Sequence, residues 1–143
     1  MHRMIQAAMG VAICVATTFA EVAAPEQRLE TEALIISGTG WTLQPLANGK
    51  KAFANRDYVW NDLPRGTSAW RYTQIAGGEP AVVAVEARKD TTVYIASTVA
   101  NPDARFAGWT SVAGVSFRYT DGGRTRLHVY ARKLKTGECA SLP

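Results

Sequence analysis

The sequence predicts an all-β protein, an antiparallel β-sandwich with a jelly-roll-like arrangement. Runs rich in Val, Ile, Thr and aromatic residues are short, and several alternate between apolar and polar positions. Clusters of Gly, Asn, Asp and Pro separate these runs, and no long apolar period of 3.6 residues follows residue 32. Many short strands with frequent turns are typical of a sandwich or a barrel, and we favour the sandwich.

The first half of the domain contains short β-rich runs between turn residues. We expect a first strand at 33–37, where Leu and Ile dominate, closed by the Gly-Thr-Gly sequence at 38–40. Pro64 disfavours a helix at the residue before it, so 63–66 is predicted to be a loop. Further short strands are expected at 41–44, 51–53, 58–60 and 70–75.

Two hairpins are the clearest local signals in the second half. The runs 81–87 and 92–98 flank a four-residue turn, and the first alternates as a half-buried strand does. An Asp-Gly-Gly turn at 121–123 joins the runs 115–120 and 125–134, and Asp-Gly between β-rich runs is a strong hairpin signal. A last strand is expected close to the C-terminus.

The N-terminus has the three parts of a secretory signal peptide. Residues 1–3 form a short basic start, 5–16 are almost wholly apolar, and 18–20 offer small residues at the two positions that a signal peptidase reads. The apolar run is shorter than the roughly 20 residues that cross a bilayer core. We therefore expect a cleaved signal peptide at 1–20, a secreted or periplasmic protein, and no membrane span after cleavage. A second acceptable cleavage site at 22–24 would move the mature start by about four residues.

The remaining chain is expected to form a linker and one domain. Residues 21–32 are polar and have no apolar face, which predicts a linker, and 33–143 is predicted to be the β-sandwich domain. Cleavage would leave Cys139 as the single cysteine, so an intramolecular disulfide is excluded and Cys139 is expected to fill a core position. The net charge of +4 is mild and does not require nucleic acid as a partner, and export argues against such a partner.

Residues that carry chemistry are sparse. His128 would be the single histidine after cleavage, and its place on a strand suits neither a catalytic triad nor a zinc site. Asp57 and Asp62 could hydrolyse glycosides only if two loop carboxylates lay about 5–10 Å apart. Together with Asn55 and Asn61 they leave calcium as an alternative, although no calcium-loop motif is present. We predict no catalytic residue, no metal site and no other cofactor.

Aromatic residues are more suggestive of a ligand. Trp41, Trp60, Trp70 and Trp109 all lie beyond the predicted signal peptide. Trp packs protein cores, but the flat face of an exposed Trp or Tyr ring also stacks on the C–H face of a sugar. Trp60 and Trp109 lie near predicted loops and are the expected surface rings, while Arg side chains suit hydroxyl and carboxylate groups. The predicted ligand-binding residues are Trp60, Trp109, Arg56, Arg65 and Arg105.

A series of segments from Asn55 to the C-terminus resembles a known type of domain. "NRDYVWNDLP", "WRYTQIAGG", "TTVYIAST", "GWTSVAG" and "FRYTDGGRTRLHVYARKLKTGECASLP" follow one another in this order. The series resembles small β-sandwich modules in secreted proteins of marine and planctomycete-like bacteria, which often accompany sialidase-like or other polysaccharide-active domains. The shared motifs are the "tVYiA" strand at 92–96, the "GW" loop at 108–109 and the final strand at 133–143. The resemblance implies an accessory module and no catalytic residue.

Together these features predict non-catalytic carbohydrate binding, or accessory binding at the cell envelope, with a polysaccharide or another envelope protein as the partner. Two alternatives stay open. The first is a small polysaccharide hydrolase or lyase that uses loop carboxylates. The second is a structural or protein-interaction module of the envelope, in which the aromatic side chains are all buried.

Overall fold

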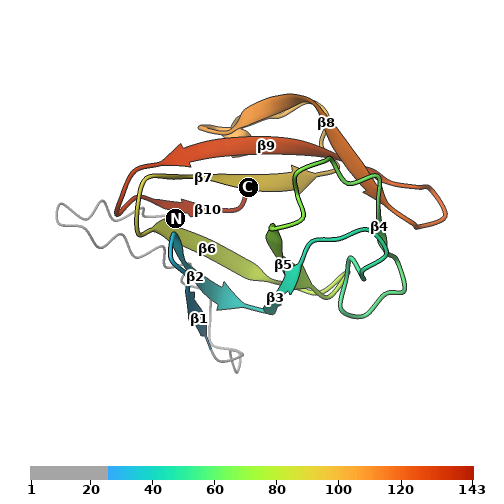
Figure 1. Cartoon of the computed structure of the whole chain (residues 1–143), viewed down its shortest axis with the longest axis horizontal. Coiled ribbons are helices and arrows are strands. Elements are labelled where there is room, and N and C mark those ends of the chain that lie inside the picture. Colours follow the sequence, from blue (N-terminus) through green and yellow to red (C-terminus); the bar gives the residue numbers. More distant parts are fainter. Residues whose placement is uncertain (1–25) are drawn as a thin grey trace. The chain divides into compact units, whose positions relative to one another are not determined.

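The computed structural model describes residues 26–143, which form ten β-strands and one short 3-10 helix (Figure 1). The strands form three sheets with antiparallel pairing, and the prediction of an all-β antiparallel sandwich is confirmed. Within these residues no helix has the length and apolar character needed to cross a membrane. The predicted signal peptide at 1–20 lies outside the described residues.

Residue contacts divide the chain into two compact units, and each unit combines segments that are distant in sequence. The first unit contains the described residues up to Thr39, together with Val82–Val93 and Lys133–Pro143. The second unit contains Gly40–Ala81 and Tyr94–Arg132. The domain predicted from the sequence thus consists of two compact units.

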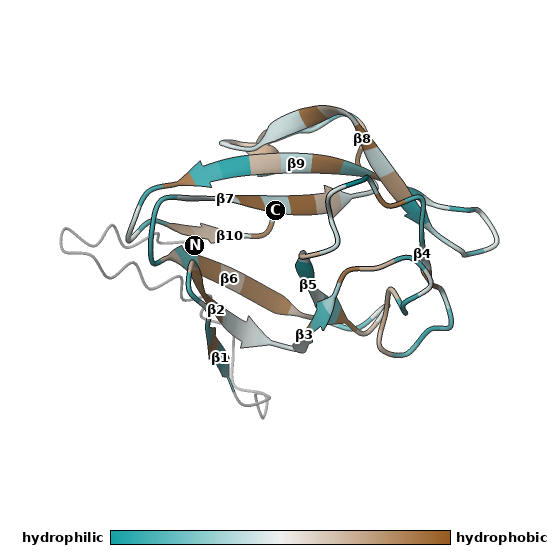
Figure 2. Cartoon of the chain, in the orientation of Figure 1, coloured by the Kyte–Doolittle hydropathy of each residue, from teal (hydrophilic) through white to brown (hydrophobic). Residues whose placement is uncertain are grey.

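The first unit is built on a four-stranded sheet. Its strand order is β1-β2-β6-β10, so β2 and β6 are the inner strands (Figure 1). β6 is mostly apolar along its length, as an inner strand is expected to be (Figure 2). The four strands are β1 (Gln27–Glu30), β2 (Leu34–Thr39), β6 (Val82–Ala87) and β10 (Cys139–Ser141).

Strand β1 corrects part of the predicted linker. Residues 27–30 pair antiparallel with β2, with Leu29 opposite Ile36, although all four side chains of β1 are exposed. An edge strand needs only backbone partners on one side. No alternation of apolar and polar residues therefore marks this strand in the sequence.

The backbones of β2 and β6 approach each other closely at Gly38. Its φ is +128°, and a Cβ atom there would lie 1.9 Å from the carbonyl oxygen of Val82. Glycine alone combines this φ with the absence of a Cβ atom. β2 therefore continues through the glycine to Thr39, two residues beyond the end that the sequence suggested.

Two turns of the first unit are joined by a carboxylate. Asp90 precedes β7 (Thr91–Ser97) and accepts hydrogen bonds from Lys135 Nζ at 2.8 Å and from the Thr136 amide at 3.0 Å. The hydrogen bond from Lys135 is the main reason that the pKa of Asp90 is lowered from its ordinary value. The turn before β7 and the turn before β10 are thus held together by polar contacts.

The predicted hairpin of 81–87 and 92–98 is correct in its strands and wrong in its pairing. β6 pairs with β2 and β10, whereas β7 belongs to the sheet that contains β9. Alternation reports that a strand is half-buried, and it does not identify the partner strand. A short turn between two strands was therefore an incomplete signal for a hairpin.

The second unit contains a two-stranded sheet and most of a second four-stranded sheet. The two-stranded sheet has the order β3-β5, and the four-stranded sheet has the order β4-β8-β9-β7. Strands β7 and β9 also contribute residues to the first unit. The strands of these two sheets are β3 (Trp41–Pro45), β4 (Trp60–Asn61), β5 (Arg71–Ile75), β7, β8 (Thr110–Tyr119) and β9 (Arg126–Leu134).

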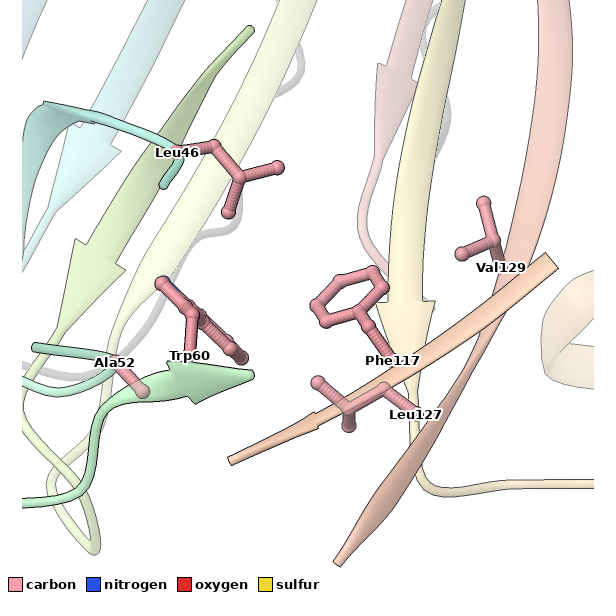
Figure 3. Packing of buried hydrophobic residues seen from close by; sticks show 6 residues of the cluster. All are labelled: Leu46, Ala52, Trp60, Phe117, Leu127 and Val129. Atoms are coloured by element: carbon pink, nitrogen blue, oxygen red, sulfur yellow. The ribbon is translucent and has the colours of Figure 1, made fainter. Parts of the chain in front are cut away.

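A cluster of buried apolar side chains forms the core of the second unit. Trp60 of β4 and Phe117 of β8 meet edge to face, with ring centroids 5.4 Å apart (Figure 3). Burying a side chain of this size stabilises a fold by about 1.5–3 kcal/mol. The buried members of the cluster are Leu46, Ala52, Trp60, Phe117, Leu127 and Val129.

The predicted turn at 121–123 joins β8 and β9 as expected. Asp121 accepts one hydrogen bond from the Thr125 amide and one from the Thr125 hydroxyl, each at 2.6 Å. Arg124 completes the turn with a φ of +47°, and its amide donates to the Asp121 carbonyl at 3.0 Å. The carboxylate thus supplies the hydrogen bonds that this tight connection needs.

Candidate functional site

The second unit carries a pair of stacked aromatic rings on its surface. The centroids of Trp70 and Tyr94 lie 4.6 Å apart and their planes differ by 29°. The two residues are 37% and 45% exposed. Because the facing sides of the rings shield each other, the exposed area lies on their edges and outer faces. We define Trp70 and Tyr94 as the surface aromatic pair.

The backbone around Trp70 is held from both sides. The Trp70 amide donates to the Thr67 carbonyl at 2.9 Å, and the Trp70 carbonyl accepts from the Leu46 amide at 2.9 Å. The Thr67 hydroxyl in turn donates to the Pro64 carbonyl at 2.9 Å. Successive hydrogen bonds therefore hold the loop that ends at Trp70, and they fix the backbone position from which its side chain extends.

Strand alternation turns Tyr94 toward solvent. In β7 the side chain of Val93 is buried and that of Ile95 is half-buried, while Tyr94 between them is exposed. Successive side chains of a strand point to opposite faces of the sheet. Tyr94 is therefore held on the outer side by the same register that turns Val93 inward.

Arg65 lies in the same loop as Trp70. It is exposed and precedes Gly66, whose φ of +86° makes the bend of the loop. Among the described residues no side chain or backbone group forms a hydrogen bond or ion pair with its guanidinium group. Arg65 is thus the predicted ligand-binding residue that shares a structural element with the surface aromatic pair.

Trp60 is a correction to the predicted surface rings. It is only 7% exposed, and its ring meets Tyr72 edge to face with centroids 5.4 Å apart. Phe117 meets the same ring edge to face at the same distance (Figure 3). Pairing of β4 with β8 places Tyr119 opposite Trp60 and turns the indole into the core. A ring in this position has no free face to offer a ligand.

Trp109 and Arg105 belong to the segment around the 3-10 helix Ala104–Phe106. Trp109 is half-buried, and its amide donates to the Phe106 carbonyl at 2.9 Å. Arg105 forms an ion pair with Asp103 at 2.7 Å. The hydrogen bonds from Arg105 lower the pKa of Asp103 to about 2, so the arginine serves first to hold this turn.

Arg56 also has a local structural partner. Its Nη2 donates to the Gly77 carbonyl at 3.3 Å, and Asn55 bonds to Gly77 through both its amide nitrogen and its oxygen. These contacts fasten the loop of 51–58 to the residues after β5. Arg56 is exposed but lies in a different loop from Arg65 and Trp70.

The loop carboxylates considered for hydrolysis or calcium binding pair with different cations. Asp57 forms an ion pair with Lys51 at 3.0 Å, and Asp62 forms one with Arg118 at 2.6 Å. Within residues 26–143 no three His, Cys, Asp or Glu side chains gather where they could hold a metal ion. The arrangement favours ion pairing over a shared catalytic or calcium site.

Comparison of the chain with protein-family models, with curated proteins and with solved structures finds no match. The resemblance to accessory modules of polysaccharide-active proteins stays a prediction from the motifs in the sequence.

Sequence reasoning missed both members of the surface aromatic pair. Trp70 was expected in a strand, but it ends the preceding loop, and β5 begins at Arg71. Tyr94 carries a readable signal, since it stands out of phase with Val93 and Ile95 in an alternating strand. No pattern in the sequence shows that Tyr94 meets Trp70, because the two residues are far apart in the chain.

Proposed function

We propose that the protein is an exported, non-catalytic carbohydrate-binding module in which Trp70 and Tyr94 hold a sugar. The exposed, stacked pair carries the proposal. Aromatic residues are enriched where proteins bind ligands, and this pair leaves ring surface accessible to one. A pyranose has an apolar C–H face that matches the outer face or edge of such a ring.

The geometry of the pair suits a preformed site. Stacking keeps both side chains in place before a ligand arrives, and stacked aromatic pairs contribute about 0.5–1.5 kcal/mol beyond their buried area. A rigid aromatic surface loses little conformational entropy on binding. The pair is therefore suited to a weak, shape-based interaction with the face of a sugar.

Arg65 is the polar residue that we assign to the same site. A guanidinium group can donate two parallel hydrogen bonds to a pair of hydroxyls or to a carboxylate. Arg65 lies five residues before Trp70 in the loop that ends at this ring. We propose that Arg65 selects among sugars that Trp70 and Tyr94 bind without distinction.

A glycan array followed by calorimetry tests the proposal on the purified protein. We expect binding to a subset of polysaccharides, and Trp70→Ala or Tyr94→Ala to weaken it at least about tenfold, a loss of about 1.4 kcal/mol. Tyr58→Ala is the matched control, because Tyr58 is exposed and stacks on Tyr119 at 5.8 Å. This control should bind within about twofold of the unchanged protein.

Other outcomes would overturn the proposal in distinct ways. A folded sample that binds no glycan but captures an envelope protein through Trp70 would show an interaction module instead. Turnover of a polysaccharide that disappears in Asp57→Asn or Asp62→Asn would show the hydrolase alternative. Equal losses in Tyr58→Ala and Tyr94→Ala would place the sugar site elsewhere.

A further inference from the structure

Strand β8 contains a large bulge opposite β9. The register passes from Ser111 opposite Tyr130 to Ser116 opposite His128. Four residues of β8, 112–115, therefore stand against the single residue Val129 of β9. Gly114 at the bulge has a φ of +73°, which allows the strand to bend sharply. We call residues 111–116 the β8 bulge.

A hollow of about 280 Å³ lies beside the β8 bulge. Its other walls are Arg126, His128 and Val129 of β9, and no acidic residue lines it. Arg126 Nη1 donates to the Ser116 hydroxyl at 3.2 Å. The residues that line the hollow thus carry a guanidinium group, an imidazole and two serine hydroxyls, on two strands of which one is bulged.

The charge of Arg126 has no acidic partner within residues 26–143. Arg118 stands directly opposite Arg126 across the two strands, and like charges in such a pair destabilise a sheet. Asp62 compensates Arg118 through an ion pair at 2.6 Å. Arg126, whose charge no acidic side chain of the described residues compensates, and the half-buried His128 both line the hollow. A positive charge without an acidic partner favours an anion nearby.

His128 was expected to be an unremarkable strand histidine. It lies in β9 as expected and pairs there with Ser116 of β8, but it is half-buried at the wall of the hollow. Its imidazole forms no hydrogen bond or ion pair with another described residue. Either protonation state of an imidazole can donate an N–H to an anion. The position therefore offers a second donor beside the guanidinium group of Arg126.

We propose that the hollow beside the β8 bulge binds an oxyanion, either a carboxylate or a sulfate group. Arg126 supplies charge-assisted hydrogen bonds, His128 supplies a further N–H, and the Ser111 and Ser116 hydroxyls complete the polar lining. The volume is at the lower end of small-molecule sites, so it fits one charged group or one acidic ring. This site does not depend on sugar binding by Trp70 and Tyr94.

Nitrogen-15 NMR spectra of the purified protein test the site with sodium sulfate and sodium glucuronate as probes. Sodium chloride keeps the ionic strength constant, and neutral glucose serves as the uncharged comparison. We expect saturable shifts of the amides of 111–116 and 126–129 with at least one anion and none with glucose. A preference for glucuronate indicates a carboxylate ligand, and a preference for sulfate indicates a sulfated one.

Variants separate a specific site from general attraction by positive charge. Arg126→Gln should weaken binding of the preferred anion at least about tenfold, and His128→Phe about threefold. Lys133→Gln removes one positive charge from an exposed position of the same strand and should change the affinity less than twofold. Trp70→Ala should leave these shifts unchanged, whatever its effect on sugar binding.

Two results would overturn the oxyanion site. One is the absence of saturable shifts around the β8 bulge with either anion while the spectrum is that of a folded protein. The other is equal weakening by Arg126→Gln and Lys133→Gln, which would mean that net charge alone attracts the anion. The spectrum of each variant without ligand verifies that it is folded.

Discussion

The buried rings around Trp60 and the exposed rings of Trp70 and Tyr94 are two solutions for aromatic side chains within one unit. Trp60 meets its neighbours edge to face at interplanar angles of 81° and 75°. Trp70 and Tyr94 lie nearly parallel at 29°. Edge-to-face contacts surround a ring from several directions, whereas a stacked pair covers one face of each ring. The first arrangement builds a core, and the second leaves surface for a ligand.

The largest expected difference between the two groups is in stability. Trp60→Ala removes a buried indole and leaves a cavity, so the free energy of unfolding should fall by about 3–5 kcal/mol. Trp70→Ala removes an exposed ring and should cost about 1 kcal/mol. Urea unfolding followed by circular dichroism measures both values. Similar losses in the two variants would mean that Trp70 is as structural as Trp60.

Fluorescence should separate the two groups next most clearly. Trp41 and Trp60 are 5% and 7% exposed, so acrylamide should reach them poorly, while it should quench Trp70 readily. Trp70→Phe is expected to remove most of the easily quenched emission, and Trp109 should account for the remainder. Trp60→Phe should leave that fraction nearly unchanged. A large decrease with Trp60→Phe would contradict the buried position of this ring.

A smaller effect tests whether the two rings of the surface aromatic pair stabilise each other. A double-mutant cycle of Trp70→Ala and Tyr94→Ala should give a coupling of about 0.5–1.5 kcal/mol in the free energy of unfolding. The same cycle of Trp70 with Tyr58, which stacks on Tyr119, should give a coupling near zero. Coupling of equal size in both cycles would indicate a general loosening of the unit.

The smallest expected effect concerns the turn carboxylates, one in each unit. Hydrogen bonds from Thr125 lower the pKa of Asp121, and the hydrogen bond from Lys135 is the main cause that lowers the pKa of Asp90. Because each folded-state pKa lies below the ordinary value of 3.8, the stabilisation is complete above that pH. It is lost as the pH falls through the lowered value.

Thermal melting between pH 6 and pH 2 measures this loss. Asp121→Asn and Asp90→Asn remove the titrating group and should each melt with a weaker dependence on pH below about 4 than the unchanged protein. Asp57→Asn is the control, because Asp57 lies in a loop and pairs only with Lys51 among the described residues. If both turn variants keep the pH dependence of the unchanged protein, Asp121 and Asp90 do not contribute to the loss of stability in acid.

Turn chemistry made much of the fold predictable. Asp121 and the glycines after it predicted the turn between β8 and β9. The structure has this turn, and the Asp121 carboxylate accepts a hydrogen bond from the Thr125 amide. Pairing partners were less accessible to prediction. β6 and β7 alternate and are joined by a short turn, but each belongs to a different sheet. Strand identity depends on local pattern, while strand partnership depends on contacts between distant residues.

The candidate site was harder to predict than the fold. Trp60 and Trp70 each stand at one end of an expected strand, and proximity to a predicted loop indicated Trp60 as the exposed ring. In the structure Trp60 is the buried ring and Trp70 is the exposed one, because pairing of β4 with β8 turns Trp60 into the core. Tyr94 was readable from the phase of its strand, but its stacking on Trp70 follows from the tertiary structure alone.

Gly38 also constrains which sequences can share this fold. A Cβ atom there would overlap the Val82 carbonyl oxygen at 1.9 Å, and the φ of +128° excludes other residue types for a second reason. In a saturation library this position should accept glycine and nothing else. Descendants of a common ancestor should likewise keep it while their surface loops diverge. A related protein with the same fold is therefore expected to carry glycine where the strand that corresponds to β2 approaches its neighbour.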